Sequence, residues 1–336
     1  MHEPKRVFIT DCEGPISKND NAFELTSWYI PHGDKLFSVL SKYDDVQADV
    51  VKRPEYNAGN TLKLILPFFK AHGVTDKKMK DFSSEKILLV PEAASTLGLI
   101  SSFGPAYIVS TSYQHYINAL CESIGFPFEN TYSTRVRIDD YEIDLHEETR
   151  IQKFAEEIAR MPVMNIPASN SLNDFSEEDK GNITRLDEII WEEISQMKIG
   201  RILKEIKPVG GREKANAVMD VVRKLDTKLP EVMYVGDSIT DEEAFRLVRE
   251  GGGLTVSFNG NSYAVKTAEI GVMSPNTRIT ANIACRFLLS GKDNAIEYVK
   301  KQPRVEVMTE ENREEFSKAS SKFRKNIRGE AIGKLG

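Results

Sequence analysis

The chain has 336 residues, of which 40% are hydrophobic and 29% are charged, and its formal net charge is −6. This composition excludes a disordered chain, and the acidic balance argues against a surface that binds nucleic acid. Because the sequence has three widely spaced cysteines, no signal-peptide apolar region and no apolar stretch of membrane-spanning length, we expect a cytoplasmic protein that keeps its thiols reduced and binds no membrane.

The first predicted element is a buried strand close to the N-terminus. The apolar run 7–10 leads directly into Asp11-Cys12-Glu13-Gly14-Pro15, which is the pattern of a strand followed by a tight turn. Asp11 and Glu13 are two positions apart, so both can project from the carboxyl end of the strand, where open α/β sheets bind ligands. One carboxylate can then act as a nucleophile or metal ligand while the other transfers protons.

Residues 18–86 form a predicted helical insertion after this strand. Helical patterns cover 22–29, 34–43, 61–71 and 76–83, and the third of them has a strongly apolar face. The polar stretch before that helix contains Arg53 and Asn60, which are candidates for contacts to a substrate. A solvated loop is the alternative for the same stretch, and the sequence leaves both open.

A second buried strand is predicted at 106–109, and it ends in Ser110-Thr111-Ser112 before a helix at 113–124. Hydroxyl groups and free backbone N–H groups at a helix N-terminus suit a phosphate dianion. Ser110 and Thr111 are therefore candidate phosphate-binding residues, although Ser110 taken alone is also typical of a helix cap. A further core strand is expected near 136–139.

Residues 141–206 make a second predicted insertion, rich in acidic and apolar residues. Helices are expected at 146–160 and 183–206, with a polar loop at 167–181 between them. The module fits a second cap or a dimerisation arm, and the sequence does not decide between the two. A homodimer therefore stays open.

A basic residue follows the second insertion. Lys214 stands near the start of a predicted helix at 214–225, after the pair Gly210-Gly211, which allows a close approach of the backbone. Taken alone, a lysine at such a position is typical of a solvated helix surface. In a site with several carboxylates it can supply the balancing positive charge.

Another short apolar strand, 232–235, precedes two further acids. Asp237 follows the strand after one glycine, and Asp241 precedes a predicted helix at 242–250. Hard oxygen donors that converge from two strand ends are what Mg²⁺ needs, since it binds a few carboxylates together with water and phosphate oxygens. Asp11, Asp237 and Asp241 are thus candidate metal ligands.

The stretch from Glu310 onward is charged, and its end is basic. We expect a terminal helix with a frayed tail there in preference to an arm that binds nucleic acid. The predicted domains are a core (1–17, 87–140 and 207–300), a helical cap (18–86), a second helical insertion (141–206) and a C-terminal helical tail (301–336).

The order of these segments resembles the haloacid dehalogenase-like (HAD) superfamily of aspartate-nucleophile phosphatases. Its four motifs correspond here to strand-Asp11, strand-Ser110, helix-Lys214 and strand-Gly-Asp237-x-x-x-Asp241. The second of these is similar to the phosphoserine phosphatase branch, and the third to the sugar-phosphatase branch. Glu13 departs from the usual Asp-x-Asp of the first motif, although some phosphoserine phosphatase-like relatives carry Asp-x-Glu-Gly.

The resemblance extends beyond the four motifs. The stretch 256–260, which includes Asn259, is similar to the strand and loop that these families carry after the fourth motif. The whole chain is also similar to an uncharacterised archaeal group, some of whose members carry hydrogenase-subunit names. The fold implied is α/β, a HAD-like Rossmannoid three-layer sandwich with a mostly parallel central sheet and a helical cap that closes over the active site.

The implied activity is Mg²⁺-dependent hydrolysis of a small phosphorylated metabolite. Asp11 would attack phosphorus and become an aspartyl-phosphate, and Glu13 would protonate the leaving oxygen and then activate water. Mg²⁺ would be held by Asp11, Asp237 and the backbone carbonyl of Glu13. Asp241 would bind the metal through water or orient Lys214.

The expected substrate contacts are Ser110, Thr111, Lys214, Asn259, Arg53 and Asn60, of which Ser110 and Lys214 would hold the equatorial phosphate oxygens. Two alternatives stay open. A phosphotransferase would deliver the same aspartyl-phosphate to an alcohol, and a non-catalytic HAD-like subunit would bind a phosphorylated ligand or a partner protein. The chemical competence of all four motif positions argues against the second alternative.

Overall fold

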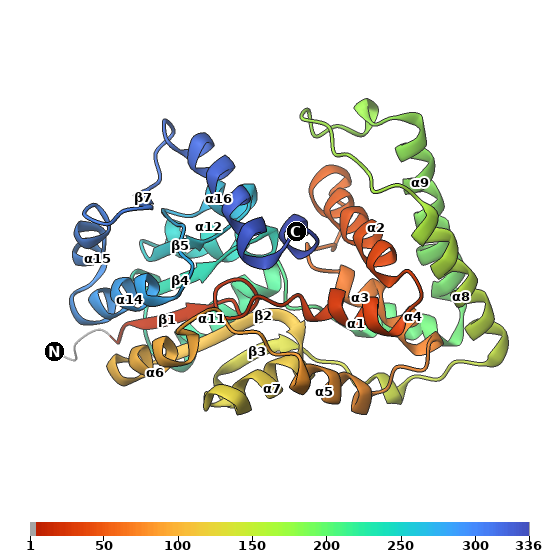
Figure 1. Ribbon diagram of the computed structural model, residues 1–336, viewed down its shortest axis with the longest axis horizontal. Coiled ribbons are helices and arrows are strands. Elements are labelled where there is room, and N and C mark those ends of the chain that lie inside the picture. Colours follow the sequence, from red (N-terminus) through yellow and green to blue (C-terminus); the bar gives the residue numbers. More distant parts are fainter. Residues whose placement is uncertain (1–4, 336) are drawn as a thin grey trace.

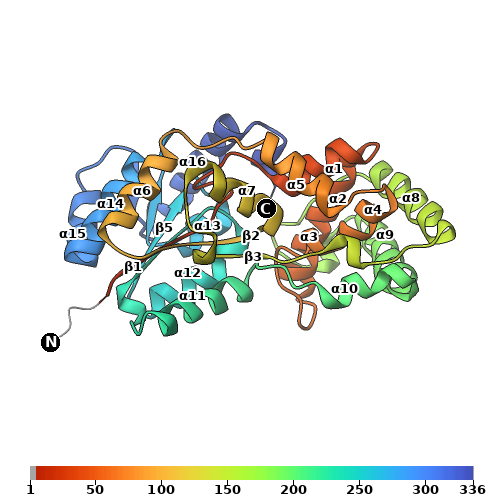
Figure 2. The ribbon, with the colours of Figure 1, turned by 90° about the horizontal axis from the view of Figure 1, so that it is seen from below.

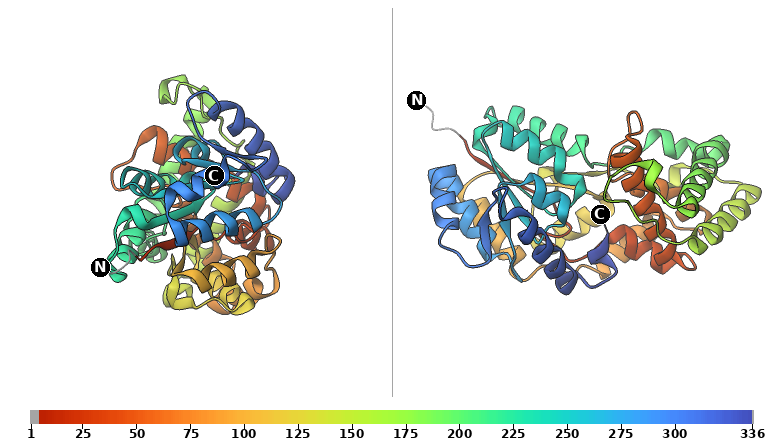
Figure 3. Two further views of the ribbon diagram at one scale, coloured as in Figure 1. Left: turned by 90° about the vertical axis from the view of Figure 1, so that its left-hand side faces the viewer. Right: turned by 90° about the horizontal axis from the view of Figure 1, so that it is seen from above.

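Two lobes make up residues 5–335, which are the residues that the computed structural model describes (Figure 1). One lobe is built around a β-sheet, and the other is formed by helices. The C-terminal end of the chain lies between the two lobes in Figure 1 and in the right-hand view of Figure 3. Within 5–335, no helix combines the length and the apolar character needed to cross a membrane.

A seven-stranded sheet with the strand order β3-β2-β1-β4-β5-β6-β7 forms the centre of the first lobe. Each neighbouring pair is parallel except β6 and β7, which confirms the predicted fold class. The strands are β1 (Val7–Thr10), β2 (Ala106–Tyr113), β3 (Thr131–Thr134), β4 (Val232–Gly236), β5 (Leu254–Phe258), β6 (Ile270–Val272) and β7 (Val305–Val307).

Helices cover both faces of this sheet, as a three-layer sandwich requires (Figure 2). Val7 and Ile9 of β1 belong to the hydrophobic cluster shared with α11 and α12, whereas Phe8 belongs to the cluster on the α6 and α14 side. Burial on both faces explains why the strands are continuous apolar runs. The core helices are α6 (Ala93–Phe103), α7 (Gln114–Ile124), α11 (Arg212–Lys224), α12 (Glu242–Glu250), α13 (Ser262–Thr267), α14 (Arg278–Ser290), α15 (Lys292–Val299) and α16 (Arg313–Arg328).

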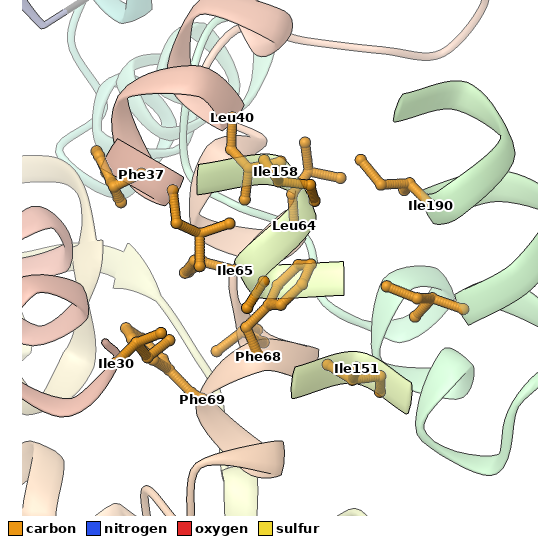
Figure 4. Close-up of a cluster of buried hydrophobic side chains, with 14 of the residues drawn as sticks. Ile30, Phe37, Leu40, Leu64, Ile65, Phe68, Phe69, Ile151, Ile158 and Ile190 are labelled. Atoms are coloured by element: carbon orange, nitrogen blue, oxygen red, sulfur yellow. The ribbon is translucent and has the colours of Figure 1, made fainter. Parts of the chain in front are cut away.

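Both insertions contribute to a single hydrophobic core in the helical lobe (Figure 4). Leu64 and Phe68 from the first insertion pack together with Ile151, Ile158 and Ile190 from the second. The two insertions therefore form one helical lobe. The α-helices of the two insertions are α1 (Asn21–Tyr29), α2 (Gly33–Asp45), α3 (Thr61–Leu64), α4 (Leu66–Ala71), α5 (Asp76–Glu85), α8 (Leu145–Arg160), α9 (Glu177–Asp187) and α10 (Arg201–Glu205).

Three predicted boundaries need correction. β2 continues through Ser110 to Tyr113, so Ser110 lies in a strand and not at a helix N-terminus. The third core strand is at Thr131–Thr134, because the parallel register with β2 begins at the Ile108–Thr131 pair, before the expected 136–139. The expected helix at 183–206 is divided into α9, a π-helical turn (Glu188–Glu193), two short 3₁₀ turns and α10.

The segment after residue 300 is part of the core lobe, which corrects the expected helical tail. β7 pairs with β6, and Phe316 of α16 packs against Gly271, where a Cβ would lie 2.4 Å from the phenyl ring. The hydroxyl of Ser320 donates a hydrogen bond of 2.7 Å to the carbonyl of Gly260, and both residues are buried. These contacts hold α16 against the end of β5, beside the cavity described next.

Candidate active site

A cavity of ≈ 100 Å³ lies where the carboxyl ends of β1, β2 and β4 face the helical lobe. Its lining combines residues from the core, the first insertion and the C-terminal segment. The core contributes Asp11, Glu13, Ser110, Thr111, Asp237, Ser238, Ile239 and Thr240; the first insertion contributes Asp20, Phe37, Ser41, Asp44, Asp45, Gly59, Thr61 and Leu62; and the C-terminal segment contributes Arg324, Arg328 and Leu335. The structure thus brings together the strand ends that the sequence singled out.

Lys214 joins two of the predicted carboxylates. Its ammonium lies 2.7 Å from Asp11 Oδ2 and 2.7 Å from Asp241 Oδ1, and its side chain is fully buried. Burial alone would lower the pKa of Lys214, but the carboxylates of Asp11 and Asp241 outweigh burial and raise this pKa above its ordinary value. Lys214 is therefore a permanent positive charge that fixes the orientation of Asp11.

Asp241 is held by four hydrogen bonds. Its Oδ1 accepts from Lys214 and from the Tyr234 hydroxyl at 2.8 Å, and its Oδ2 accepts from the backbone N–H groups of Asp237 (2.9 Å) and Ser238 (3.0 Å). A side chain at Gly236 would collide with this carboxylate, since its Cβ would lie 2.3 Å from Asp241 Cγ. Of the two roles expected for Asp241, this geometry favours the orientation of Lys214.

Asp237 forms ion pairs with two arginines that the sequence analysis did not identify as site residues. Asp237 Oδ2 accepts hydrogen bonds from Arg324 and from Arg328, the second at 3.2 Å, and the backbone carbonyl of Asp237 accepts from Arg324 at 3.2 Å. Both arginines are four positions apart on α16, so they lie on one face of that helix. This i, i+4 spacing of two arginines is the one signal in the sequence that could have indicated them.

The donor set at this edge of the sheet fits a magnesium ion in its chemistry. One carboxylate oxygen each from Asp11, Asp237 and Asp241 lies within 4.8 Å of the others, and carboxylate oxygens are the protein ligands that Mg²⁺ takes. Because Asp241 is already held by four donors, Asp11 and Asp237 are the residues that would hold the ion.

Burial changes the proton affinity of both acids of the first motif. It raises the pKa of Asp11 to about 7, with Lys214 opposing the shift and the carboxylates of Asp241 and Asp237 adding to it. Burial and the nearby Asp20 raise the pKa of Glu13 well above its usual range, against the hydrogen bond that Glu13 Oε1 accepts from the Asn21 N–H at 2.6 Å. The raised pKa favours the protonated form of Glu13, which is the form that a general acid requires.

Ser110 and Thr111 both line the cavity, but their hydroxyls have different surroundings. The Ser110 hydroxyl donates to Ser112 Oγ at 3.1 Å and accepts from the Ser112 N–H at 3.3 Å, so its partners among residues 5–335 lie within the strand. The Thr111 hydroxyl donates to the Val209 carbonyl at 3.0 Å, which fixes the loop that leads to Lys214. Ser110 is thus the better candidate for a contact to phosphate.

Four of the expected substrate contacts lie outside the cavity wall. Lys214 is fully buried and is bound to Asp11 and Asp241. Arg53 pairs with Asp187 at 3.0 Å, and its guanidinium carbon lies 4.4 Å from the centre of the Trp191 ring, so it joins the two insertions. Asn60 donates to the Asn57 carbonyl at 2.8 Å. The Asn259 side chain forms hydrogen bonds of 2.8 and 2.9 Å with the backbone of Ser274, and so it holds the loop after β6 in place. A polar stretch indicated Arg53 and Asn60, and the resemblance to the HAD superfamily indicated Asn259, but each of these three side chains makes a structural contact.

Replacement of Gly14 by alanine is expected to disrupt the site. Gly14 has φ +107°, and a Cβ would lie 2.1 Å from Asp237 Oδ2, so the carboxylate would have to leave its position. We expect a loss of about 1–3 kcal/mol from strain and displacement, together with a large loss of any turnover. Thermal unfolding and steady-state rates measure the two effects.

Gly125→Ala is the matched control for this substitution. Gly125 also has a positive φ, +68°, but nothing lies within 4 Å of its added Cβ. This variant should share the backbone strain and keep the activity. Equal losses of activity in both variants would mean that the Gly14 effect does not come from Asp237.

Among solved structures that are similar to this protein, one matches over the whole chain. A gene product of Archaeoglobus fulgidus has 29% sequence identity and a TM-score of 0.84, and the match covers 99% of each chain. The two-lobe fold, with both insertions and the C-terminal segment, therefore occurs in a second protein. No family model matches the sequence, and neither does any curated protein.

Two further structures are similar over part of the fold. A phosphoserine phosphatase in the form of its phospho-aspartyl intermediate analogue has 12% identity and a TM-score of 0.48, over 82% of this chain and 97% of that one. A HAD family hydrolase from Salmonella enterica subsp. enterica serovar Typhi has 11% identity and a TM-score of 0.46, over 79% of this chain and 66% of that one.

Proposed function

We propose that the protein is a Mg²⁺-dependent phosphohydrolase of the HAD superfamily that acts on a small phosphorylated metabolite. The observation that carries this proposal is the buried Asp11–Lys214–Asp241 triad beside Asp237. It supplies a carboxylate nucleophile, a fixed cation and a metal ligand at one edge of a parallel sheet. Asp11 and Asp237 line a cavity at the carboxyl ends of parallel strands, where ion pairs with a purely structural role are seldom found.

The chain's own residues fit a two-step transfer. Asp11 Oδ1 accepts the Cys12 N–H at 2.6 Å and Oδ2 accepts Lys214, so the carboxylate is oriented for in-line attack on phosphorus. Glu13 gives its proton to the leaving oxygen and afterwards takes one from the attacking water. A magnesium ion held by Asp11 and Asp237 would neutralise the phosphate charge.

The cap lobe limits the size of the substrate. The cavity is smaller than the roughly 300–1,000 Å³ typical of sites for drug-sized ligands. Phe37 and Leu62 close it with apolar surface, while Asp44 and Thr61 are tied together by a hydrogen bond of 2.8 Å. A small phosphoester fits this arrangement, and a larger leaving group requires the cap to open.

A screen over phosphorylated metabolites, with and without Mg²⁺, tests the proposal. We expect Mg²⁺-dependent release of inorganic phosphate from a few small phosphoesters. Adding simple alcohols to the active reactions separates hydrolysis from transfer, because a phosphotransferase would form new phosphoesters. If no member of a broad panel is turned over with Mg²⁺, the enzymatic proposal fails and a binding subunit takes its place.

A further inference from the structure

Two arginines form ion pairs with Asp237, whose carboxylate is a metal ligand in the proposed function. Arg324 and Arg328 both contact Asp237 Oδ2, and their side chains are only 4% and 5% exposed. Neither was expected from the sequence, since the basic C-terminal stretch is typical of a solvated tail. A guanidinium stays charged at any pH that the protein survives, so it can leave Asp237 only by moving.

The positions of these arginines are built into the fold. Phe316 and Ser320 hold α16 on the core through Gly271 and Gly260. Arg324 also donates to the carbonyl of Leu335 at 3.4 Å, which draws the last residues of the described chain over the cavity. The C-terminal end accordingly lies between the lobes (Figure 1).

Arg328 connects the same carboxylate to the start of the cap. Its guanidinium donates to the backbone carbonyls of Lys18 (3.1 Å) and Asn19, in the segment that leads from the core into α1. Asp20 follows in the cavity wall. A displacement of Arg328 from Asp237 would therefore also loosen the connection between the core and the cap.

We propose that Arg324 and Arg328 are an internal cation pair that competes with Mg²⁺ for Asp237, so that α16 sets the metal affinity of the site. This inference rests on the proposed function. A dication and two guanidinium groups on one carboxylate oxygen repel each other strongly at low effective dielectric. Metal binding then displaces the guanidinium groups, and by linkage anything that displaces them strengthens metal binding.

The test is a calorimetric titration of the full chain with MgCl₂. Arg324→Met and Arg328→Met keep much of the aliphatic packing and remove the charge, and we expect each to raise the Mg²⁺ affinity at least tenfold. Lys322→Met is the matched control, because Lys322 lies on the exposed side of the same helix and its removal makes the same change in net charge. We expect less than a twofold change for this control. Thermal unfolding of each variant shows whether it is folded.

Hydrogen exchange supplies a second readout in the unmodified protein. Mg²⁺ should speed the exchange of amides in 329–335 and 18–21, because their tethers to Arg324 and Arg328 are released. Unchanged exchange in both segments would overturn the displacement.

Two results of the Mg²⁺ titration would refute the competition, and they differ in whether the proposed metal site survives. Equal or weaker Mg²⁺ binding in both arginine variants, with binding intact in the unmodified protein, overturns the competition alone. The absence of Mg²⁺ binding in every variant, the unmodified protein included, removes the metal site of the proposed function and the competition with it. If one arginine variant does not fold, the Mg²⁺ affinity of the other variant still tests the competition.

Discussion

Asp11→Asn should abolish turnover and every phosphorylated form of the protein. Asparagine keeps the size of the side chain and can still accept the Cys12 N–H through its carbonyl oxygen, but its amide nitrogen cannot attack phosphorus. It also presents an NH₂ group where Lys214 needs an acceptor. Asp241 still pairs with Lys214, so the cation stays in place and phosphate can bind beside Ser110. We expect a loss of activity of several orders of magnitude.

Glu13→Gln should separate the two chemical steps. Glutamine can still accept the Asn21 N–H, so the start of α1 keeps its contact, but the acid and base function is lost. With an activated ester whose leaving group needs little protonation, transfer of the phosphoryl group to Asp11 should proceed, whereas hydrolysis of the aspartyl-phosphate should slow. Phosphoenzyme should then accumulate. Intact-mass spectrometry after a rapid acid quench detects the added phosphoryl group.

Glu24→Gln is the matched control for this pair of experiments. Glu24 lies on α1 near Glu13 and bonds to Asn19 at 2.8 and 3.0 Å, but it lies outside the cavity wall. It should release phosphate at the normal rate. Turnover that survives in Asp11→Asn would refute the assignment of Asp11 as the nucleophile. Accumulation of phosphoenzyme in Glu24→Gln would show that the effect of Glu13→Gln is not specific to the proton transfer assigned to Glu13.

The strand ends of the site could be predicted from sequence because their signals are local. An apolar run followed at once by Asp11, Ser110 or Gly236-Asp237 contains both the strand and the functional group within a few residues. Parallel pairing then brings these ends to one edge of the sheet without further information. Lys214 has no such local signal, since a lysine near a helix start is typical of a solvated surface, and only the order of the four motifs along the chain indicated its place in the site.

The arginines could not be predicted in this manner because their partner is distant. Arg324 and Asp237 are 87 positions apart, and a basic helix near a chain end is far more often solvated than buried. The single cap lobe is a similar case. The apolar faces of the helices in 18–86 and 141–206 are each visible in the sequence, but nothing local says that they cover each other. For Arg53 the sequence predicted a contact to substrate, but the side chain pairs with Asp187 of the second insertion, which is also distant in the sequence.

Asp237→Asn is expected to weaken Mg²⁺ binding strongly and also to destabilise the fold. A site with few protein ligands cannot replace a lost carboxylate by water alone. The same substitution leaves Arg324 buried without its counter-charge, and breaking a buried ion pair from one side costs about 3–5 kcal/mol. From the sequence alone only the first effect would be expected. Calorimetric Mg²⁺ titration and urea unfolding measure the two effects separately.

A double substitution shows whether the two losses have different origins. Asp237→Asn combined with Arg324→Met removes both charges of the Arg324 ion pair, while Arg328 keeps its bonds to the Lys18 and Asn19 carbonyls. The double variant should therefore recover the stability that Asp237→Asn loses through Arg324, and none of the metal affinity. A stable Asp237→Asn single variant would mean that the ion pair with Arg324 contributes little to the fold. Unchanged Mg²⁺ affinity in that variant would place the metal elsewhere in the protein. Recovery of stability without recovery of metal binding is the result that identifies Asp237 as the residue shared by the arginines and the ion.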